Sequence, residues 1–426
     1  MLAGEPRGGG AGATARVSGR RIDAVDALRG FALFGIVVVN ITYLASGYRM
    51  AGLAAPTFSA PLDWGTRWVV SVFFENKFYL LFAFLFGYSF TLQIDSAHRA
   101  ATAFVPRFLR RLGGLLLLGV VHGVLLFPGD ILATYAVMGL VLLVVRRITP
   151  RAAMIAAVAL TVALAAGVLL LAGLAVLGAD ASKAVTENAA EAALSDRALH
   201  GSASMIIGEH VHRLAKILLL RVFFQGPTVL AACLVGMALG KLRLLSDLSG
   251  YTATLRRLQW VGFTAGFAGA LVYAHSTWSG GGHAYHLLGQ SVNLVTAPLL
   301  AAAYAATLLR LLPARPGLTG LLAPPGRLAL TNYLGQSLIG SLIFTGYGLS
   351  LVDMLGPFPA VSIGVGVFVV QAAWSRRWSR RHRYGPVEWL LRWFTNWQRP
   401  SRSPAATAAT VAPGPPRAPD DGRESG

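Results

Sequence analysis

The side chains best suited to chemistry stand within or beside apolar segments. His122 lies five residues before Phe127, near the end of one apolar run, and Asp130 follows directly after the turn Pro128-Gly129. An imidazole can accept a proton near neutral pH, and a nearby carboxylate can orient it. We therefore predict that His122 is a general base oriented by Asp130. The alternative is that His122 bonds a neighbouring helix while Asp130 only caps the helix that follows.

A second candidate group is the triplet Glu75-Asn76-Lys77, which has phenylalanines on both sides. Charges inside a membrane span are costly, so each needs a partner or a function. Side chains two positions apart do not face each other on a helix, and Glu75 and Lys77 therefore need different partners. The triplet is predicted in the outer half of its span, where an interfacial segment turns inward. Either it takes part in the chemistry, or Lys77 forms a structural ion pair with Asp130.

Four arginines could receive a phosphorylated ligand at the cytoplasmic ends of the helices: Arg29, Arg110, Arg111 and Arg327. The guanidinium fork matches the geometry of phosphate oxygens. Each of these residues could instead be a flanking cation whose side chain extends to the membrane surface. In that case Asp26 is available as an ion-pair partner.

The segment 275–286 contains three histidines, Trp278 and the loop Ser279-Gly280-Gly281-Gly282. It could form a mouth that binds an acceptor, or it could be an ordinary polar loop. No histidine in the chain has the H-E-x-x-H spacing of a zinc protease, so we expect no metal. The chain also lacks a G-x-x-x-x-G-K-[ST] phosphate loop and a G-x-S-x-G elbow. Primary ATP-driven transport by this chain alone is therefore not expected.

These residues must be positioned by helices in a membrane. Of the 426 residues 55% are hydrophobic and 13% charged, with a mean hydropathy of +0.58, whereas soluble domains are about 25% charged. No strand pattern is evident, so the predicted class is all-α, a polytopic membrane protein with about ten transmembrane helices. The ten apolar runs are Ala27–Leu44, Trp68–Leu92, Leu112–Phe127, Ile131–Val145, Ala152–Leu177, Leu214–Leu239, Leu258–Ala274, Leu287–Leu309, Leu328–Leu351 and Ala360–Trp374.

The net charge of +19 indicates orientation rather than nucleic-acid binding. With ten spans and a cytoplasmic N-terminus, 28 lysines and arginines fall in cytoplasmic segments, 5 in outer segments and 4 within spans. This is the positive-inside pattern. We therefore predict cytoplasmic N- and C-termini in a multi-pass protein of the cell (inner or plasma) membrane. Its expected partner is the lipid bilayer and not nucleic acid.

One integral membrane domain is predicted over residues 22–398. The outer loop within it contains Ser182–Leu199, which is predicted to form a surface helix. Gly119/Gly123 and two similar glycine pairs would let neighbouring helices approach closely. In chain order the predicted parts are a disordered cytoplasmic tail (1–21), an N-terminal half (about 22–178), the outer loop (179–213), a C-terminal half (about 214–397) and a second disordered cytoplasmic tail (399–426).

The sequence resembles the YeiB-like family of bacterial membrane proteins over roughly residues 22 to 397. The motifs that carry the resemblance are Asp23-Ala24-Val25-Asp26-Ala27-Leu28-Arg29-Gly30, Lys77-Phe78-Tyr79-Leu80-Leu81-Phe82, Gly129-Asp130-Ile131-Leu132, Gly326-Arg327-Leu328-Ala329-Leu330-Thr331-Asn332-Tyr333 and Tyr384-Gly385-Pro386-Val387-Glu388-Trp389. The last two look like the family's C-terminal domain of unknown function. This resemblance implies a membrane domain without a defined activity.

The Asp-x-x-Arg-Gly opening is also similar to that of heparan-alpha-glucosaminide N-acetyltransferase and of other transmembrane acyltransferases. That resemblance implies about ten core spans, cytoplasmic acyl-CoA as co-substrate and a glycan acceptor across the membrane. It places Arg29 near the donor and implies that a histidine assists transfer. In the heparan enzyme this histidine lies in the loop after the first span, whereas residues 48–66 contain none here. His122 would replace it from another helix.

The leading hypothesis is a membrane acyltransferase that moves an acyl group from cytoplasmic acyl-CoA to an extracytoplasmic saccharide or lipid. His122 would act as base, Asp130 would orient it, and Arg29 would contact the donor. One alternative is a transporter or flippase of a small solute or lipid-linked sugar, although no internal repeat is evident. The other is a scaffold without enzymatic activity.

Overall fold

The computed structural model describes residues 10–50, 53, 58–177, 181–246 and 249–399, and this part of the chain is helical, without a β-strand. The elements in chain order are α1 (Gly10–Leu44), α2 (Gly47–Met50), α3 (Pro61–Phe73), α4 (Phe78–Arg99), α5 (Phe104–Leu125), α6 (Leu132–Val144), α7 (Pro150–Leu177), α8 (Ala181–His200), α9 (Ala203–Leu220), η1 (Arg221–Gln225), α10 (Gly226–Lys241), η2 (Leu244–Ser246), η3 (Ser249–Tyr251), α11 (Thr252–Trp278), α12 (Gly282–Leu311), α13 (Pro316–Arg327), α14 (Ala329–Phe344), α15 (Pro357–Ser379) and α16 (Pro386–Asn396).

The chain is an all-α polytopic membrane protein, as the apolar runs predict. Among the described residues, seven segments are long and apolar enough to cross a membrane: Asp23–Leu44, Pro61–Arg99, Phe104–Leu125, Pro150–Leu177, Ala203–Lys241, Gly282–Leu311 and Pro357–Ser379. The remaining three predicted spans overlap α6, α11 and α14. Helix α6 has 13 residues and so measures about 20 Å, which is shorter than a hydrocarbon core of about 30 Å. Ten crossings therefore stay a prediction.

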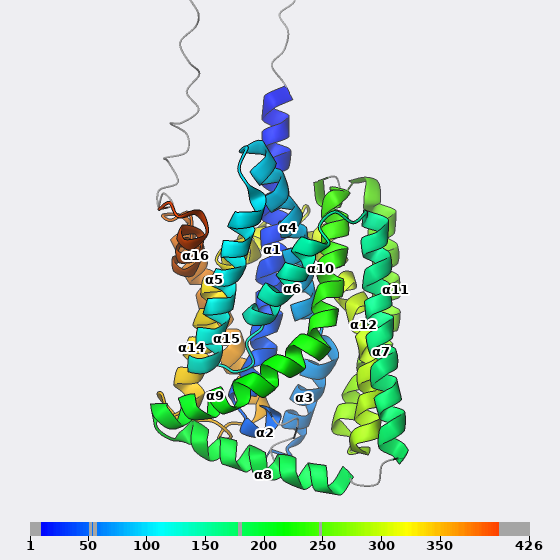
Figure 1. Cartoon of the computed structure of the whole chain (residues 1–426), viewed down its shortest axis with the longest axis vertical. Helices are drawn as coiled ribbons and strands as arrows, with labels where there is room; N and C mark the ends of the chain where they lie inside the picture. The colour runs from blue at the N-terminus through cyan, green and yellow to red at the C-terminus, as the bar shows by residue number, and fades with distance from the viewer. Residues whose placement is uncertain (1–9, 51–52, 54–57, 178–180, 247–248, 400–426) are drawn as a thin grey trace, which may run out of the picture.

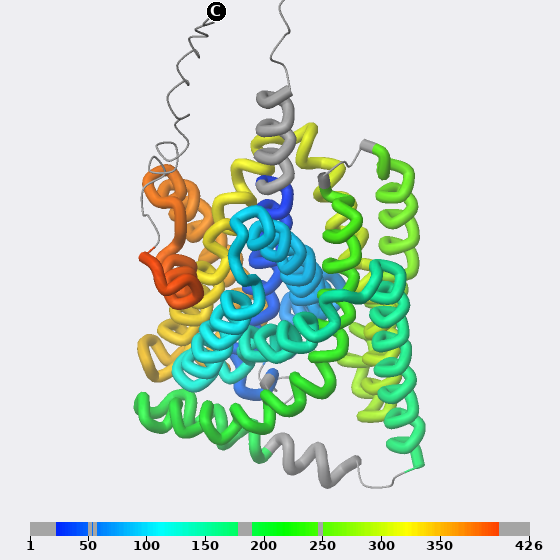
Figure 2. Tube along the Cα trace, turned by 45° about the horizontal axis from the view of Figure 1, so that its top comes forward, coloured from blue at the N-terminus to red at the C-terminus, as the bar shows by residue number. Residues whose placement is uncertain are grey.

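The helices form one bundle around α1. This helix contacts α4, α13, α14 and α15, and Ala27, Leu28, Ala32 and Leu33 on it are completely buried. Helices α7, α11 and α12 pack together on one side of the bundle, as both views show (Figures 1 and 2). Because α1 packs on C-terminal helices and α4 packs on α10, the two predicted halves share a single core.

The beginning of α1 and the terminal helix α16 lie at one end of the bundle, and α8 and α9 lie across the other end (Figure 1). The helix predicted over Ser182–Leu199 is confirmed as α8. Helix α1 begins at Gly10, inside the segment 1–21 that was predicted as a tail. Residues 1–9, and 400–426 of the second predicted tail, lie outside the described residues.

Two of the long segments are not regular helices, and both irregularities carry charged residues. The Pro61–Arg99 segment breaks between α3 and α4, where Asn76 has a positive φ of 65°. This break confirms the turn predicted at Glu75-Asn76-Lys77. The Ala203–Lys241 segment contains the π-helical turn η1, which begins at Arg221. Such turns occur frequently at functional sites.

Candidate functional site

His122 and Asp130 form a buried pair at the hairpin between α5 and α6. The His122 Nδ1 and Asp130 Oδ1 atoms are 2.9 Å apart, and the two residues are 2% and 4% exposed. The other carboxylate oxygen, Oδ2, accepts the backbone N–H of Ala133 at 2.9 Å. Asp130 therefore both caps α6 and holds the imidazole, so the two predicted roles are combined in one residue.

The second imidazole nitrogen of this pair is unused. His122 Nε2 is buried and has no hydrogen-bond partner among the described residues. Because an ionised carboxylate only accepts hydrogen bonds, Asp130 places the imidazole proton on Nδ1 and leaves a lone pair on Nε2. The ring of Tyr333 lies beside the imidazole, with centroids 5.2 Å apart. The imidazole is thus held through one nitrogen, while the other has no partner among the described residues.

Gly119 lets this pair form, because α6 passes close to α5 at that position. A Cβ atom on Gly119 would lie 2.6 Å from both the backbone nitrogen of Ala133 and Oδ2 of Asp130. Contacts under 3.0 Å are essentially never tolerated, so only glycine fits here without a shift. The predicted close packing at Gly119 is confirmed, and it bears directly on the orientation of Asp130.

Arg221 stands next to the same hairpin, although sequence reasoning noted it only as a charge within a span. A Cβ atom built on Gly129 would lie 3.1 Å from Nη2 of Arg221. The guanidinium also acts electrostatically on Tyr43, Tyr79 and Tyr333. The site therefore holds a cation beside the His122–Asp130 pair. The π-turn that presents it could not be recognised from hydropathy.

Glu75 is the centre of a second buried cluster, formed with residues of α2, α3 and α11. Its Oε1 atom accepts a hydrogen bond from Arg49, and its Oε2 atom accepts bonds from Tyr273 at 3.0 Å and Ser71 at 3.2 Å. Trp278 donates its indole N–H to the Ser71 hydroxyl at 2.9 Å. Arg49 was counted in the sequence only as an outer loop charge, and its contact with Glu75 depends on the tertiary fold.

Lys77 is completely buried and does not pair with Asp130. Its Nζ atom donates to the Ser71 carbonyl oxygen at 2.8 Å and lies 5.9 Å from the centre of the Tyr273 ring. The proposed structural ion pair with Asp130 is therefore wrong. The helix break turns Lys77 back toward the end of α3, where a backbone oxygen near the break is available.

A cleft of about 50 Å³, on the side predicted to be the outer one, opens beside Glu75. Arg49, Arg67 and Trp278 line it, and the Trp278 ring lies 4.8 Å from the Arg49 guanidinium and 5.5 Å from that of Arg67. Asp353 also lines the cleft and accepts the backbone N–H of Gly47 at 2.8 Å. Its carboxyl pKa is raised above the ordinary range, chiefly because burial disfavours the charged form. Trp278 is the part of the predicted acceptor mouth that reaches this cleft.

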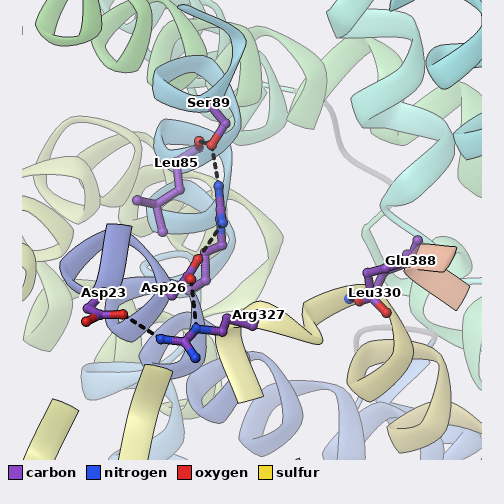
Figure 3. A network of polar contacts seen from close by, with 8 residues as sticks. Asp23, Asp26, Leu85, Ser89, Arg327, Leu330 and Glu388 are labelled. Carbon is purple, nitrogen blue, oxygen red and sulfur yellow. Dashed lines mark hydrogen bonds and ion pairs between the residues drawn. The ribbon is translucent and has the colours of Figure 1, made fainter. Parts of the chain in front are cut away.

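The predicted donor contact Arg29 lies near the beginning of the apolar span Asp23–Leu44, away from the cleft. Arg29 donates to Asp26 at 2.7 Å and to the hydroxyl of Ser89 at 2.5 Å. Arg327 bonds Asp23 at 2.5 Å and approaches Asp26 at 3.4 Å. Figure 3 shows this network. The charges of Arg29 and Arg327 are thus balanced by two carboxylates. This agrees with the alternative prediction, in which these arginines flank the membrane and pair with Asp26.

Arg111 adds positive charge next to that network. Its Nε atom is buried without a hydrogen-bond partner among the described residues, and Arg29 lies within electrostatic range. The nearby Glu388 is engaged elsewhere, since it accepts the backbone N–H groups of Leu330 and Thr331 at 2.7 and 3.0 Å. Within the part of the chain that the structure describes, Arg110 donates to the Pro106 carbonyl of its own helix. Asp26 thus links Arg29 to Arg327, Arg111 lies near Arg29 without bonding it, and Arg110 stands apart from them.

The fold and these sites define a polytopic helical membrane protein with buried charged clusters. Residues 239–398 match the family described as protein of unknown function (DUF418). The uncharacterized protein YxaH of Bacillus subtilis (strain 168) is 31% identical over 402 residues, covering 90% of this chain and 96% of that protein. The uncharacterized protein YeiB of Escherichia coli (strain K12) is 30% identical over 382 residues, which cover 87% of this chain and 95% of that protein.

A third relative is an uncharacterized 39.9 kDa protein in the amylase 3' region of Bacillus acidopullulyticus. It is 26% identical over 390 residues, which cover 88% of this chain and 94% of that protein. No solved structure matches the chain significantly. The chain belongs to the YeiB-like family, as the motif resemblance predicts.

Proposed function

We propose that this protein is a membrane acyltransferase that uses cytoplasmic acyl-CoA and an extracytoplasmic saccharide or lipid acceptor. The observation that supports the proposal is the buried pair of His122 and Asp130, which leaves one imidazole nitrogen unpartnered. A histidine that only stabilises helix packing would use both nitrogens or face solvent. An oriented imidazole with a free lone pair is instead the arrangement required of a general base.

The proposed reaction needs no further reagent. His122 Nε2 takes the proton from a hydroxyl group of the acceptor. The oxygen of that hydroxyl attacks the carbonyl carbon of the thioester. The carbon–sulfur bond then breaks, and the coenzyme A thiolate receives the proton back from the imidazolium. Asp130 stabilises that imidazolium through Nδ1, and the guanidinium of Arg221, beside the Gly129-Asp130 turn, is the proposed partner of the negative oxygen that develops at the carbonyl.

The donor would be held from the end of the bundle that carries Arg29. Because Asp23 and Asp26 already neutralise Arg29 and Arg327, Arg111 is the strongest candidate for a coenzyme A phosphate. The acceptor would enter through the outer cleft lined by Trp278, since an aromatic ring flanked by arginines suits a sugar or a phosphorylated headgroup. Donor and acceptor would then approach His122 from opposite faces.

The test uses purified full-length protein with acetyl-CoA as the probe. We expect binding by calorimetry and release of the coenzyme A thiol when a lipid and glycan extract supplies the acceptor. His122→Asn should retain binding and lower thiol release by about 100-fold or more, whereas His212→Asn, an exposed histidine on the outer side, should leave it unchanged. Absence of acetyl-CoA binding, or equal rates in the two variants, would overturn the proposal.

The alternative of a transporter or flippase is favoured by one observation, the break between α3 and α4 together with the π-turn at Arg221. Discontinuous helices form the substrate sites of many transporters. Proteoliposomes separate the two functions, because a transporter accumulates solute without consuming acetyl-CoA. Uptake of a lipid-linked or free sugar that persists in His122→Asn would favour transport.

A further inference from the structure

A groove between α13 and α15 is separate from the clusters described above. Its volume is about 600 Å³, and its lining residues are Gly320, Leu321, Val369, Ala372, Ala373, Arg376, Arg377 and Arg380. The arginines of its lining stand at the end of α15 that leads into α16. The lining contains apolar side chains and arginines but no acidic residue.

The groove is amphiphilic along the axis of α15. Val369 and Leu321 are 60% and 53% exposed, as expected for side chains that face lipid tails. Arg376 follows Val369 by seven residues, which places it about 10 Å farther along the helix. An apolar wall therefore leads directly into a group of guanidinium groups.

The three arginines are available to a ligand. Arg376, Arg377 and Arg380 are exposed, and none forms an ion pair with an acidic side chain among the described residues. The rings of Trp374 and Trp378, tilted against each other with centroids 5.0 Å apart, lie at the same level of α15. Tryptophan is enriched at the membrane–water interface, so the arginines stand at the height of lipid headgroups.

We infer that this groove binds an anionic glycerophospholipid of the cytoplasmic leaflet. The phosphate would be held by the arginines at the end of α15, because guanidinium groups match phosphate oxygens. One acyl chain would lie along Leu321 and Val369 toward the membrane centre. Basic pockets between transmembrane helices on the cytoplasmic side are suited to such headgroups. A soluble anion would use the arginines but would leave the apolar wall uncovered.

The experiment measures lipid binding to delipidated full-length protein in neutral detergent by native mass spectrometry. Phosphatidylglycerol should bind with clear preference over phosphatidylcholine. The variant R376Q/R377Q/R380Q should bind it about 100-fold more weakly, since each cation near an anionic lipid contributes a factor of about five. The matched control is R315Q/R381Q/R399Q, which removes the same charge outside the groove lining and should change binding less than about threefold.

Three outcomes would overturn this inference. An equal loss of phosphatidylglycerol binding in the two triple variants would show that the lipid is attracted by the overall positive charge of the protein rather than by the groove. Full competition by soluble glycerol phosphate would show a site for the anion alone. Retained preference for phosphatidylglycerol in R376Q/R377Q/R380Q, with its helical content intact, would place lipid binding elsewhere. A third variant, Val369→Asp, should weaken lipid binding without removing an arginine, and unchanged binding in it would also contradict the inference.

Discussion

The Arg49–Glu75 ion pair gives the sharpest test of the structure, and it does not depend on any activity. The two side chains are only 12% and 4% exposed. Glu75→Leu removes the carboxylate and leaves the guanidinium of Arg49 and the hydroxyl of Tyr273 without their main partner. Removing one partner of a buried ion pair costs about 3–5 kcal/mol. We expect a loss of about 4 kcal/mol in the free energy of unfolding.

The complete measurement is a double-mutant cycle. Arg49→Leu should cost about 3 kcal/mol, because Tyr273 and Ser71 still donate to Glu75 but cannot balance its charge. The double variant should cost much less than the two single losses added together, with a coupling energy of at least 2 kcal/mol. The assay is denaturant unfolding in detergent micelles, under conditions where refolding is demonstrated.

The control cycle uses Lys216 and Glu191, an ion pair whose side chains are 64% and 38% exposed. Exposed pairs contribute between about 0 and 1 kcal/mol, so Lys216→Leu should have little effect. A coupling energy below about 1 kcal/mol for Arg49 and Glu75, similar to the control pair, would refute the reasoning. It would mean that water or another cation reaches Glu75 and that the cluster is not desolvated.

The remaining predictions concern the α5–α6 hairpin and the cleft beside Glu75. Gly119→Val should displace Asp130 and lower the free energy of unfolding by about 1–3 kcal/mol through overpacking, and release of the coenzyme A thiol should be lost. The control is Gly113→Val, since a Cβ atom at Gly113 has nothing within 4 Å. It should be neutral in the same unfolding and thiol-release assays. Asp353 has a pKa raised by burial, so its protonated form is favoured by folding. Its contribution to stability is complete below the unfolded pKa of about 3.9 and is lost as the pH rises through the folded pKa. Asp353→Asn should therefore flatten the pH dependence of unfolding above about pH 4, and an unchanged slope would contradict this assignment.

The local order of the site was predictable where its members are close in sequence. His122 and Asp130 are separated by eight residues and a Pro-Gly turn, so a short hairpin brings them together whatever surrounds it. The break at Glu75-Asn76-Lys77 could likewise be anticipated, because charges of opposite sign interrupt an aromatic run. In both cases the relevant distances are set by helix rise and turn geometry, which are local properties.

The partners of these residues depended on helix packing. Glu75 contacts Arg49 and Tyr273, which are 26 and 198 positions away, and neither distance in sequence indicates contact. An ion pair of Lys77 with Asp130 was one of two alternatives for that residue, yet the helix break at Asn76 directs Lys77 to the backbone oxygen of Ser71. Opposite charge alone cannot decide which of several helices faces a given side chain.

Hydropathy, charge and motif thus determined by themselves that this chain is an all-α membrane protein of the YeiB-like family, because burial in lipid constrains composition at every position of a span. Tertiary structure alone decided which buried charges are neutralised and which are available. It brought Arg327 to Asp23 and Asp26 and placed Arg221 beside Asp130. The reason is that helix register and rotation are set by side-chain packing between segments distant in sequence, including the contact at Gly119.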